Sequence, residues 1–112
     1  QQNAVRLVRG TVRKLGITGL KKQMALVEGF HKVCEVGLAG SSALNAANLH
    51  VICSSMNCTY FEYWMPKEVH QWGVKEELKI NERGNLEVPT GPGLGIELDE
   101  EWIAAHKIAT LS

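Results

Sequence analysis

Short apolar or β-branched runs alternate with helical patterns through the first 66 residues, and this alternation limits the fold more than any other feature. The runs Val5–Val8, Lys32–Val36 and Tyr60–Tyr63 predict strands. Helical patterns separate them, over about Gly19–Phe30 and Ser42–Ser54. Strands joined by such short connections through a helix are typical of parallel βαβ units. The sequence therefore predicts an α/β fold built on parallel strands.

Each predicted helix has a start signal and an apolar stripe. Thr18 is placed to cap the first helix, and Gly40, Ser41 and Ser42 form a loop before the second. Apolar residues at helical spacing predict the buried faces: Leu20, Met24 and Val27 in the first helix, and Leu44, Ala47 and Val51 in the second.

The pattern changes beyond residue 66. Two runs, Glu77–Ile80 and Asn85–Val88, are joined by Asn-Glu-Arg-Gly, which predicts a β-hairpin with Gly84 in the left-handed conformation. The following PTGPGLG predicts a rigid turn, and Asp99 is expected to cap a last helix that ends near residue 108. We therefore divide the chain into residues 1–66 and residues 67–112.

Charge and cysteine content exclude several classes of protein. Twelve basic and twelve acidic side chains give zero net charge, which argues against nucleic acid or an anionic membrane as partner. The three cysteines form no C-x-x-C pair, so we expect buried free thiols at Cys34, Cys53 and Cys58 and a reducing compartment. There is no bilayer-spanning apolar run and no apolar leader, so the expected location is the cytoplasm.

The charges are unevenly spread along the chain. Solvated helix faces explain this most simply, and an anion site at the basic end is the alternative. The basic residues near the start are Arg6, Arg9, Arg13, Lys14, Lys21 and Lys22. A nucleic-acid surface formed by the same residues is a weaker hypothesis, because the net charge is zero.

The motifs NAANLH, NC-x-YFE and PTGPGLG occur in this order within three segments of the chain. These segments resemble mandelate racemase/muconate lactonizing enzymes of the enolase superfamily. RLVRGTVRKLGITGLKKQMALVEGF is similar to the sixth strand and its helix, with the turn Leu15-Gly16-Ile17-Thr18-Gly19 one glycine short. CEVGLAGSSALNAANLHVICSSMNCTYFE is similar to the seventh strand, its helix and the eighth strand. VPTGPGLGIELDEEWI is similar to the segment that returns to the capping domain.

The resemblance implies that the chain is the C-terminal segment of a (β/α)8, TIM-type barrel, followed by a hairpin and a helix. Family members are magnesium-dependent enzymes that remove the proton α to a carboxylate. The substrate implied is a small hydroxy acid or sugar acid, and the reaction a dehydration or racemisation. The family's magnesium ligands and lysine bases lie on strands that precede this segment, so the resemblance places no metal ligand in this chain.

Three positions carry over from the family. Glu62 matches a carboxylate that hydrogen-bonds the substrate, a role that a protonated glutamate could fill. Gly37 occupies the position of the family's His base, and Thr11 that of its Asp partner, or Gly10 if the one-residue gap is placed differently; none of these can move a proton as those groups do. The chain alone is therefore expected to be inactive, either as part of a larger enzyme or as a degenerate module that binds a carboxylate or another subunit.

Other motifs have plainer interpretations. We expect His50 to bond a neighbouring loop, and Asn45 and Asn48 to link a helix to a loop. The Gly37–Ser42 loop reads as a flexible connection, with anion binding at the helix start as the alternative. Trp64, Trp72 and Trp102 are expected as core or interface anchors, and Trp64 alternatively as a pocket wall near Glu62.

Three strands with two helices would leave sheet edges unpaired. We therefore expect either association with the rest of a barrel or a homo-oligomer that restores closure.

Overall fold

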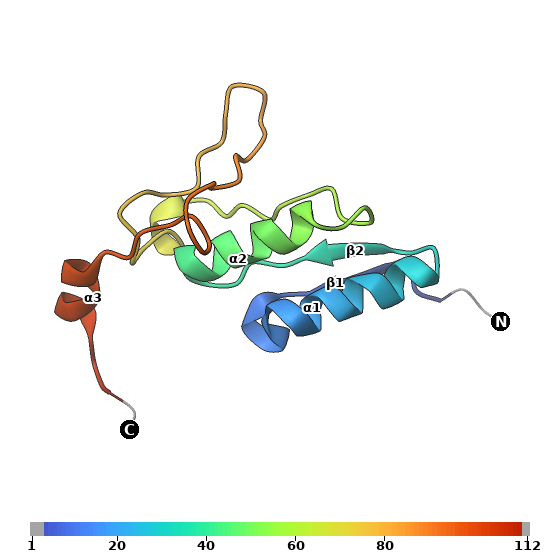
Figure 1. The fold of residues 1–112 in the computed structure, drawn as a ribbon, viewed down its shortest axis with the longest axis horizontal. Coiled ribbons are helices and arrows are strands. Elements are labelled where there is room, and N and C mark those ends of the chain that lie inside the picture. The colour runs from blue at the N-terminus through green and yellow to red at the C-terminus, as the bar shows by residue number, and fades with distance from the viewer. Residues whose placement is uncertain (1–3, 111–112) are drawn as a thin grey trace.

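A computed structural model describes residues 4–110 and gives them an α/β arrangement (Figure 1). Strands β1 and β2 pair in parallel, with Leu7 beside Val33 and Gly10 beside Val36. The helix between them completes the βαβ unit that the sequence predicts. The elements in chain order are β1 (Leu7–Gly10), α1 (Val12–Gly29), β2 (Val33–Val36), α2 (Ser42–Cys53), the 3-10 turn η1 (Lys67–Val69) and α3 (Glu100–His106).

The third predicted strand, Tyr60–Tyr63, is reduced to one parallel bridge between Val36 and Phe61. Upstream of it, the N–H of Cys34 donates to the carbonyl of Asn57 over 2.9 Å. No longer ladder forms, because β2 ends at Val36 and the backbone N–H of Leu38 beyond it donates to a side chain, that of Glu62.

Helix α1 begins earlier than the sequence predicts, and Thr18 is not its cap. Thr11 is the N-cap residue, in an extended conformation and without a side-chain capping bond. The N–H of Val12 is instead satisfied from α2, by Asn48 Oδ1 at 3.0 Å. Gly16, with φ of 65°, interrupts the helical conformation. The apolar stripe alone therefore reveals only the part of the helix after this kink.

Strand β1 lies two residues later than the predicted Val5–Val8. Its pairing with β2 fixes its extent, and this pairing includes Arg9 and Gly10 in place of the more apolar residues before them. Neither β-propensity nor alternation marks those two residues as strand. The shift matters because it places Arg9 near the end of the strand.

The main core lies between α1, the two strands and α2 (Figure 1). Leu20, Met24 and Val27 are buried there, as predicted. Leu44 of α2 is wrongly predicted as buried, because its side chain is 38% exposed. The buried face of α2 is broader and turned away from Leu44, since a second cluster around Leu78 covers Ala46 and Leu49. That cluster consists of Ala46, Leu49 and Leu78, with Phe61, Leu86, Val88, Leu94 and Ile96 packed against it.

The three cysteines are free, but only two of them are buried. Burial raises the pKa of the Cys34 and Cys58 thiols. Cys53 is exposed, contrary to the prediction. It is the last residue of α2, where the helix leaves the core.

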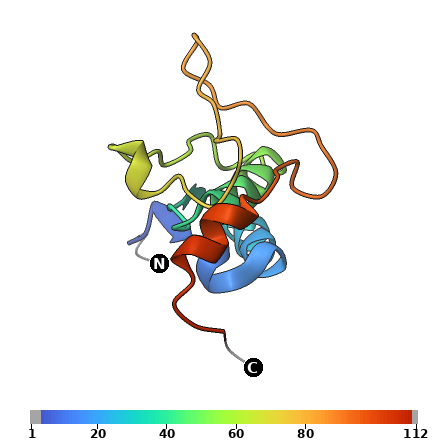
Figure 2. The ribbon, with the colours of Figure 1, turned by 90° about the vertical axis from the view of Figure 1, so that its left-hand side faces the viewer.

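A loop around residues 80–86 projects from the helical body (Figure 2), whereas Leu78, Leu94 and Ile96 belong to the cluster that packs on α2. The predicted hairpin appears as a single antiparallel bridge between Ile80 and Leu86, without strands on either side. The φ of Gly84 is 77°, so this residue has the left-handed conformation expected of it. The backbone turns here because Asn81 Oδ1 accepts from the N–H groups of Arg83 and Asn85.

Helix α3 is capped by Asp99, whose side chain accepts from the N–H of Trp102 over 2.9 Å. Trp102 stacks on Trp72 at a centroid distance of 5.3 Å and on His106 at 3.9 Å. Trp72 is therefore an anchor for α3 rather than a core residue, and it is 41% exposed. None of the helices within residues 4–110 is long and apolar enough to cross a bilayer.

Candidate functional site at the ends of the strands

The ends of three neighbouring segments meet at one edge of the sheet. The N–H of Gly37 donates to the carbonyl of Gly10 over 2.8 Å, and Glu62 follows the bridge at Phe61. A cleft of about 470 Å³ opens here, which is within the usual range for small-molecule sites. Its lining includes all three sequence-predicted positions, Thr11, Gly37 and Glu62. The other lining residues are Arg9, Gly10, Arg13, Lys14, Leu38, Gly40, Trp64 and His70.

Glu62 accepts two charge-assisted hydrogen bonds. Arg9 Nη2 donates to Oε1 in an ion pair, and the N–H of Leu38 donates to Oε2 over 2.5 Å. The Arg9 guanidinium lowers the pKa of Glu62, against an opposing effect of partial burial. The same contact raises the pKa of Arg9. This geometry favours ionised Glu62, whereas the sequence suggested a protonated glutamate.

Gly37 leaves the space that Arg9 occupies. A Cβ atom at this position would lie 2.9 Å from Arg9 Nε and 3.4 Å from Glu62 Oε2. Any larger residue would therefore have to displace the guanidinium. In the sequence, Arg9 stands out only as one member of a basic cluster. Its position directly before the strand-ending Gly10 was the signal that could have singled it out.

Thr11 lies at the junction of β1 and α1. Its side chain is 8% exposed, and its buried Oγ1 has no hydrogen-bond partner among residues 4–110. The hydroxyl does not cap α1. Thr11 thus lines the cleft with a hydroxyl that no other described residue bonds.

Buried amides hold the loop of the cleft in place, as predicted. Asn48 Nδ2 donates to the carbonyl of Gly37 over 2.9 Å, and the N–H of Ala39 donates to Asn45 Oδ1 over 3.0 Å. His50 Nε2 is 3.0 Å from the carbonyl oxygen of Leu94, which confirms its predicted contact with a loop. Because the N–H groups of Leu38 and Ala39 are already bonded, they are not free for the anion binding considered for this loop.

Trp64 lines the cleft, as one interpretation of the sequence expected, and half of its side chain is exposed. It does not belong to the core. The rings of Trp64 and His70 contact each other edge to face, at a centroid distance of 4.6 Å. These two rings close one side of the cleft.

The donor set does not form a metal site. Within residues 4–110, no group of three or more His, Cys, Asp or Glu side chains is placed to hold a metal ion. Glu62, the carboxylate that lines the cleft, is already bonded to Arg9 and Leu38. The residues described do not fit the family's magnesium ion.

Comparison with known proteins gives matches of high structural similarity. A Pseudovibrio sp. structure described as a mandelate racemase/muconate lactonizing enzyme has a TM-score of 0.86 and 32% identity, covering 93% of this chain and 28% of that chain. An isomerase from Streptomyces coelicolor A3(2) has a TM-score of 0.78 and 32% identity, covering 93% and 29%. A mandelate racemase/muconate lactonizing enzyme from Sulfitobacter sp. has a TM-score of 0.72 and 26% identity, covering 97% and 27%.

The chain is an α/β protein, and its cleft lies at the carboxyl ends of the parallel strands. Residues 1–102 match the family of enolase C-terminal domain-like proteins. The chain belongs to this family, and its sequence resemblance to mandelate racemase/muconate lactonizing enzymes is confirmed. It spans less than a third of the length of each of these three structures. A comparison with curated proteins gives no match.

Proposed function

We propose that this chain forms the sixth-to-eighth-strand segment of a barrel in a magnesium-dependent, mandelate racemase-like enzyme. The reaction is removal of the proton α to the carboxylate of a hydroxy acid or sugar acid, leading to dehydration or racemisation. The observation that carries the proposal is the meeting of Arg9, Gly37 and Glu62 in one cleft at the strand ends of a family member. In barrel enzymes, catalytic groups lie at this end of the strands.

In this proposal, Glu62 and Arg9 bind and orient the substrate. Ionised Glu62 fixes one end of the guanidinium through Nη2, and the remaining N–H groups of Arg9 face a half-exposed environment. Those groups suit a substrate carboxylate, which guanidinium binds with charge-assisted hydrogen bonds. The role of Glu62 is therefore to position Arg9, in place of donating a proton itself.

Proton abstraction needs groups that the cleft does not offer. Gly37 has no side chain, and the Thr11 hydroxyl is a poor base. The magnesium ion of the proposed parent would be held by residues outside those described. We therefore expect residues 1–66 to pack into the rest of a barrel, residues 67–112 to return toward a capping domain, and the isolated chain to show no turnover.

A second candidate is a non-catalytic module that binds a small carboxylate or another subunit. It is favoured by the contact between Gly37 and Arg9, because the guanidinium fills the space where the family's histidine would project. Arg13 and Lys14 line the same cleft, so its basic side chains outnumber its carboxylate, Glu62. This candidate predicts binding without chemistry even in a complete barrel.

A chimera tests both candidates. Residues 4–102 would replace the matching segment of the Pseudovibrio structure's protein, and proton exchange at the α carbon of acid sugars would be followed in deuterated water. We expect no exchange with Gly37 and Thr11 in place. Thr11→Asp and Gly37→His should restore it when combined with Arg9→Ala, since the guanidinium would otherwise clash with a side chain at position 37. Without Arg9, the substrate carboxylate is left to Arg13 and Lys14, so we expect the restored exchange to need a higher substrate concentration.

The matched control is the chimera with Arg9→Ala alone, which clears the space without supplying a base. Exchange in the triple variant but not in this control supports the enzyme. A folded triple variant that binds acid sugars without exchange supports the non-catalytic module instead. All chimeras would carry alanine in place of any lysine base that the Pseudovibrio segment supplies. Exchange in the chimera that keeps Gly37 and Thr11 would then show that residues 11 and 37 are wrongly assigned.

A further inference from the structure

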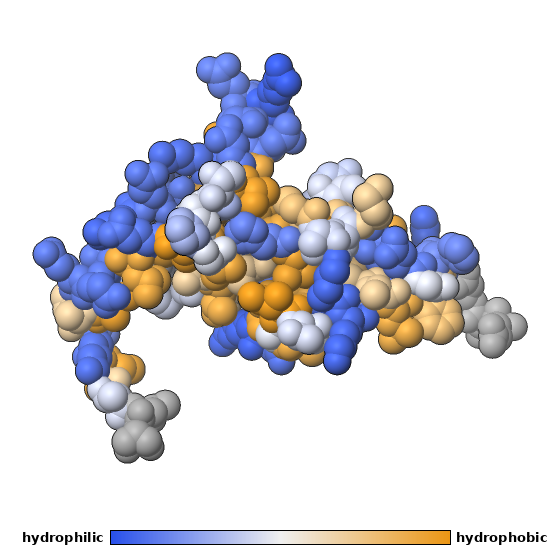
Figure 3. Space-filling model, viewed as in Figure 1, coloured by the Kyte–Doolittle hydropathy of each residue, from blue (hydrophilic) through white to orange (hydrophobic). Residues whose placement is uncertain are grey.

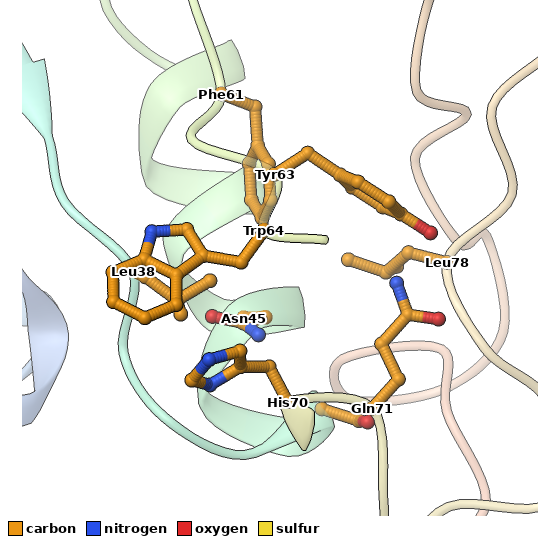
Figure 4. A pocket seen from close by; sticks show the side chains of 9 residues that line it. Leu38, Asn45, Phe61, Tyr63, Trp64, His70, Gln71 and Leu78 are labelled. Atoms are coloured by element: carbon orange, nitrogen blue, oxygen red, sulfur yellow. The ribbon is translucent and has the colours of Figure 1, made fainter. Parts of the chain in front are cut away.

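A small enclosed recess lies beside the cleft, behind Trp64 and His70 (Figure 4). Its volume is about 10 Å³, which is room for roughly one water-sized group. Leu38, Trp64 and His70 line both the cleft and the recess, so the two spaces are neighbours. The remaining walls are Ser42, Asn45, Phe61, Tyr63, Gln71 and Leu78.

The recess gathers buried polar atoms that have no partner. Within residues 4–110, six buried side-chain atoms lack a hydrogen bond, and three of them belong to its lining: Ser42 Oγ, His70 Nε2 and Gln71 Oε1. Ser42 is only 3% exposed. An unsatisfied buried polar group is costly, so such groups call for an explanation. Three of them around one space indicate that the space receives something polar.

The walls define the chemistry of that group. None of the nine lining residues is an aspartate, glutamate, lysine or arginine, which disfavours a charged occupant. A hydroxyl can donate and accept, as the mixture of serine, imidazole and amide atoms requires. The aromatic walls Phe61, Tyr63 and Trp64 suit the carbon that bears the hydroxyl.

We propose that the recess is a subsite for one hydroxyl group of a ligand whose charged end lies in the cleft. In the absence of ligand, a water molecule takes the place of this hydroxyl. The ligand class is a polyhydroxylated carboxylate: its carboxylate meets the basic groups Arg9, Arg13 and Lys14, and a hydroxyl enters behind Trp64. This inference rests on the proposed function. It adds the polar groups of the recess, which would select a ligand that carries a hydroxyl.

A site built to bond a hydroxyl discriminates against an analogue that lacks it, because the polar atoms of the protein are then left unpaired. The test is an NMR titration of this 112-residue chain with D-gluconate and with hexanoate, which has the same chain length and charge but no hydroxyls. D-gluconate should bind at least about fivefold more tightly, as expected for one buried hydrogen bond. The indole N–H signal of Trp64 should shift on binding.

Ser42→Ala and Gln71→Leu should each reduce the preference for D-gluconate by about threefold to tenfold. Ser55→Ala is the matched control, because Ser55 bonds Lys21 outside the cleft and should leave the preference unchanged. Ser42→Ala should change the melting temperature little, since within residues 4–110 its hydroxyl bonds no protein group and the variant gives up only a contact to the water in the recess. A hydroxyl with a merely structural role would instead lower it.

Equal affinity for the two compounds, or no binding of either, overturns the subsite. A preference for D-gluconate that survives both Ser42→Ala and Gln71→Leu also overturns it. The chimera assay tests the proposed function separately. Restored proton exchange together with equal affinity for the two compounds would support the proposed enzyme and reject only the hydroxyl subsite.

Discussion

At the scale of single residues, the contact between Arg9 and Glu62 decides the character of the cleft. Arg9 holds the carboxylate in its ionised form by lowering its pKa, and the backbone of Leu38 adds a second hydrogen bond. A glutamate so held accepts hydrogen bonds but does not donate one. This residue pair therefore favours recognition of an anion through Arg9 over proton transfer by Glu62.

The ion pair makes stability depend on pH in a defined direction. Because the folded-state pKa of Glu62 lies below its ordinary value of 4.5, its contribution is complete above that pH and is lost as pH falls through the folded pKa. Glu62→Gln should thus lower the free energy of unfolding at pH 7, and the difference from the unmodified chain should shrink in acid. The effect is small and sensitive to salt, because the Arg9 side chain is half exposed and solvent screens the pair.

Urea unfolding at neutral and acidic pH measures this difference. Glu82→Gln is the control, since Glu82 is an exposed residue of the turn between Ile80 and Leu86. A Glu62→Gln difference that stays constant from pH 7 to pH 3 would contradict the role assigned to Arg9.

Residue type was enough to predict that Asn45, Asn48 and His50 bond neighbouring loops, but it did not predict the role of the charged residue Arg9. Asn45, Asn48 and His50 carry hydrogen-bonding groups inside an apolar helix, and such groups must find nearby partners when buried. The role of Arg9 was not predictable in the same way. It depends on the register of β1 against β2 and on the absence of a side chain at Gly37, which lies 28 positions away in the sequence.

At the scale of elements, α1 is two helical pieces joined at Gly16. The first piece is held by the bond from Val12 N–H to Asn48, and the second by the buried stripe at Leu20, Met24 and Val27. Gly16 has φ of 65° and ψ of 173°, which residues with a side chain rarely adopt. The kink therefore sets the direction in which Thr11 and the start of the helix meet the cleft.

Gly16→Ala should destabilise the chain by about 1 kcal/mol, because alanine is strained at this φ. No atom lies within 4 Å of the Cβ that would be added, so the cost is conformational rather than steric. Gly29→Ala is the control: its Cβ also meets nothing within 4 Å, its φ is not positive, and helix propensity favours alanine. Chemical unfolding should give opposite signs for the two variants, and equal signs would argue against the kink.

The sequence predicted the order and type of the first four elements because periodicity and β-branched content are local signals. It failed where tertiary contacts decide. The start of α1 depends on an amide from α2, and the Tyr60–Tyr63 run pairs at one residue because β2 ends at Val36. The hairpin prediction placed the turn correctly at Gly84. It did not reveal that the two predicted strands pair through a single bridge, between Ile80 and Leu86.

At the scale of the whole molecule, the chain is more extended than a compact domain of its length. Its radius of gyration is 15.5 Å, against about 13 Å expected for a compact chain of 112 residues. Apolar surface is visible along the helical body, while the projecting loop is hydrophilic (Figure 3). Leu26, Phe30 and Val33 are each at least half exposed. Such a surface fits the proposed association with further barrel strands or with a second copy of the chain.

Magnesium should leave the melting temperature of this chain unchanged, because the described residues gather no ligand set. A ligand stabilises a fold only by binding its folded state. The measurement is calorimetry with millimolar magnesium chloride, against sodium chloride of equal ionic strength. A rise specific to magnesium would reveal a metal site within this chain and would overturn the assignment of the metal to other strands.

The closeness of position 37 to the Arg9 guanidinium couples two mutations that are far apart in the gene. If position 37 changed first, the new side chain would clash with a guanidinium that Glu62 still holds in place. Shortening Arg9 first gives up the ion pair but leaves space for the base. The two substitutions are therefore non-additive, as expected of residues in contact. Evolution between a binding cleft and a catalytic one at this site would then follow a preferred order of steps.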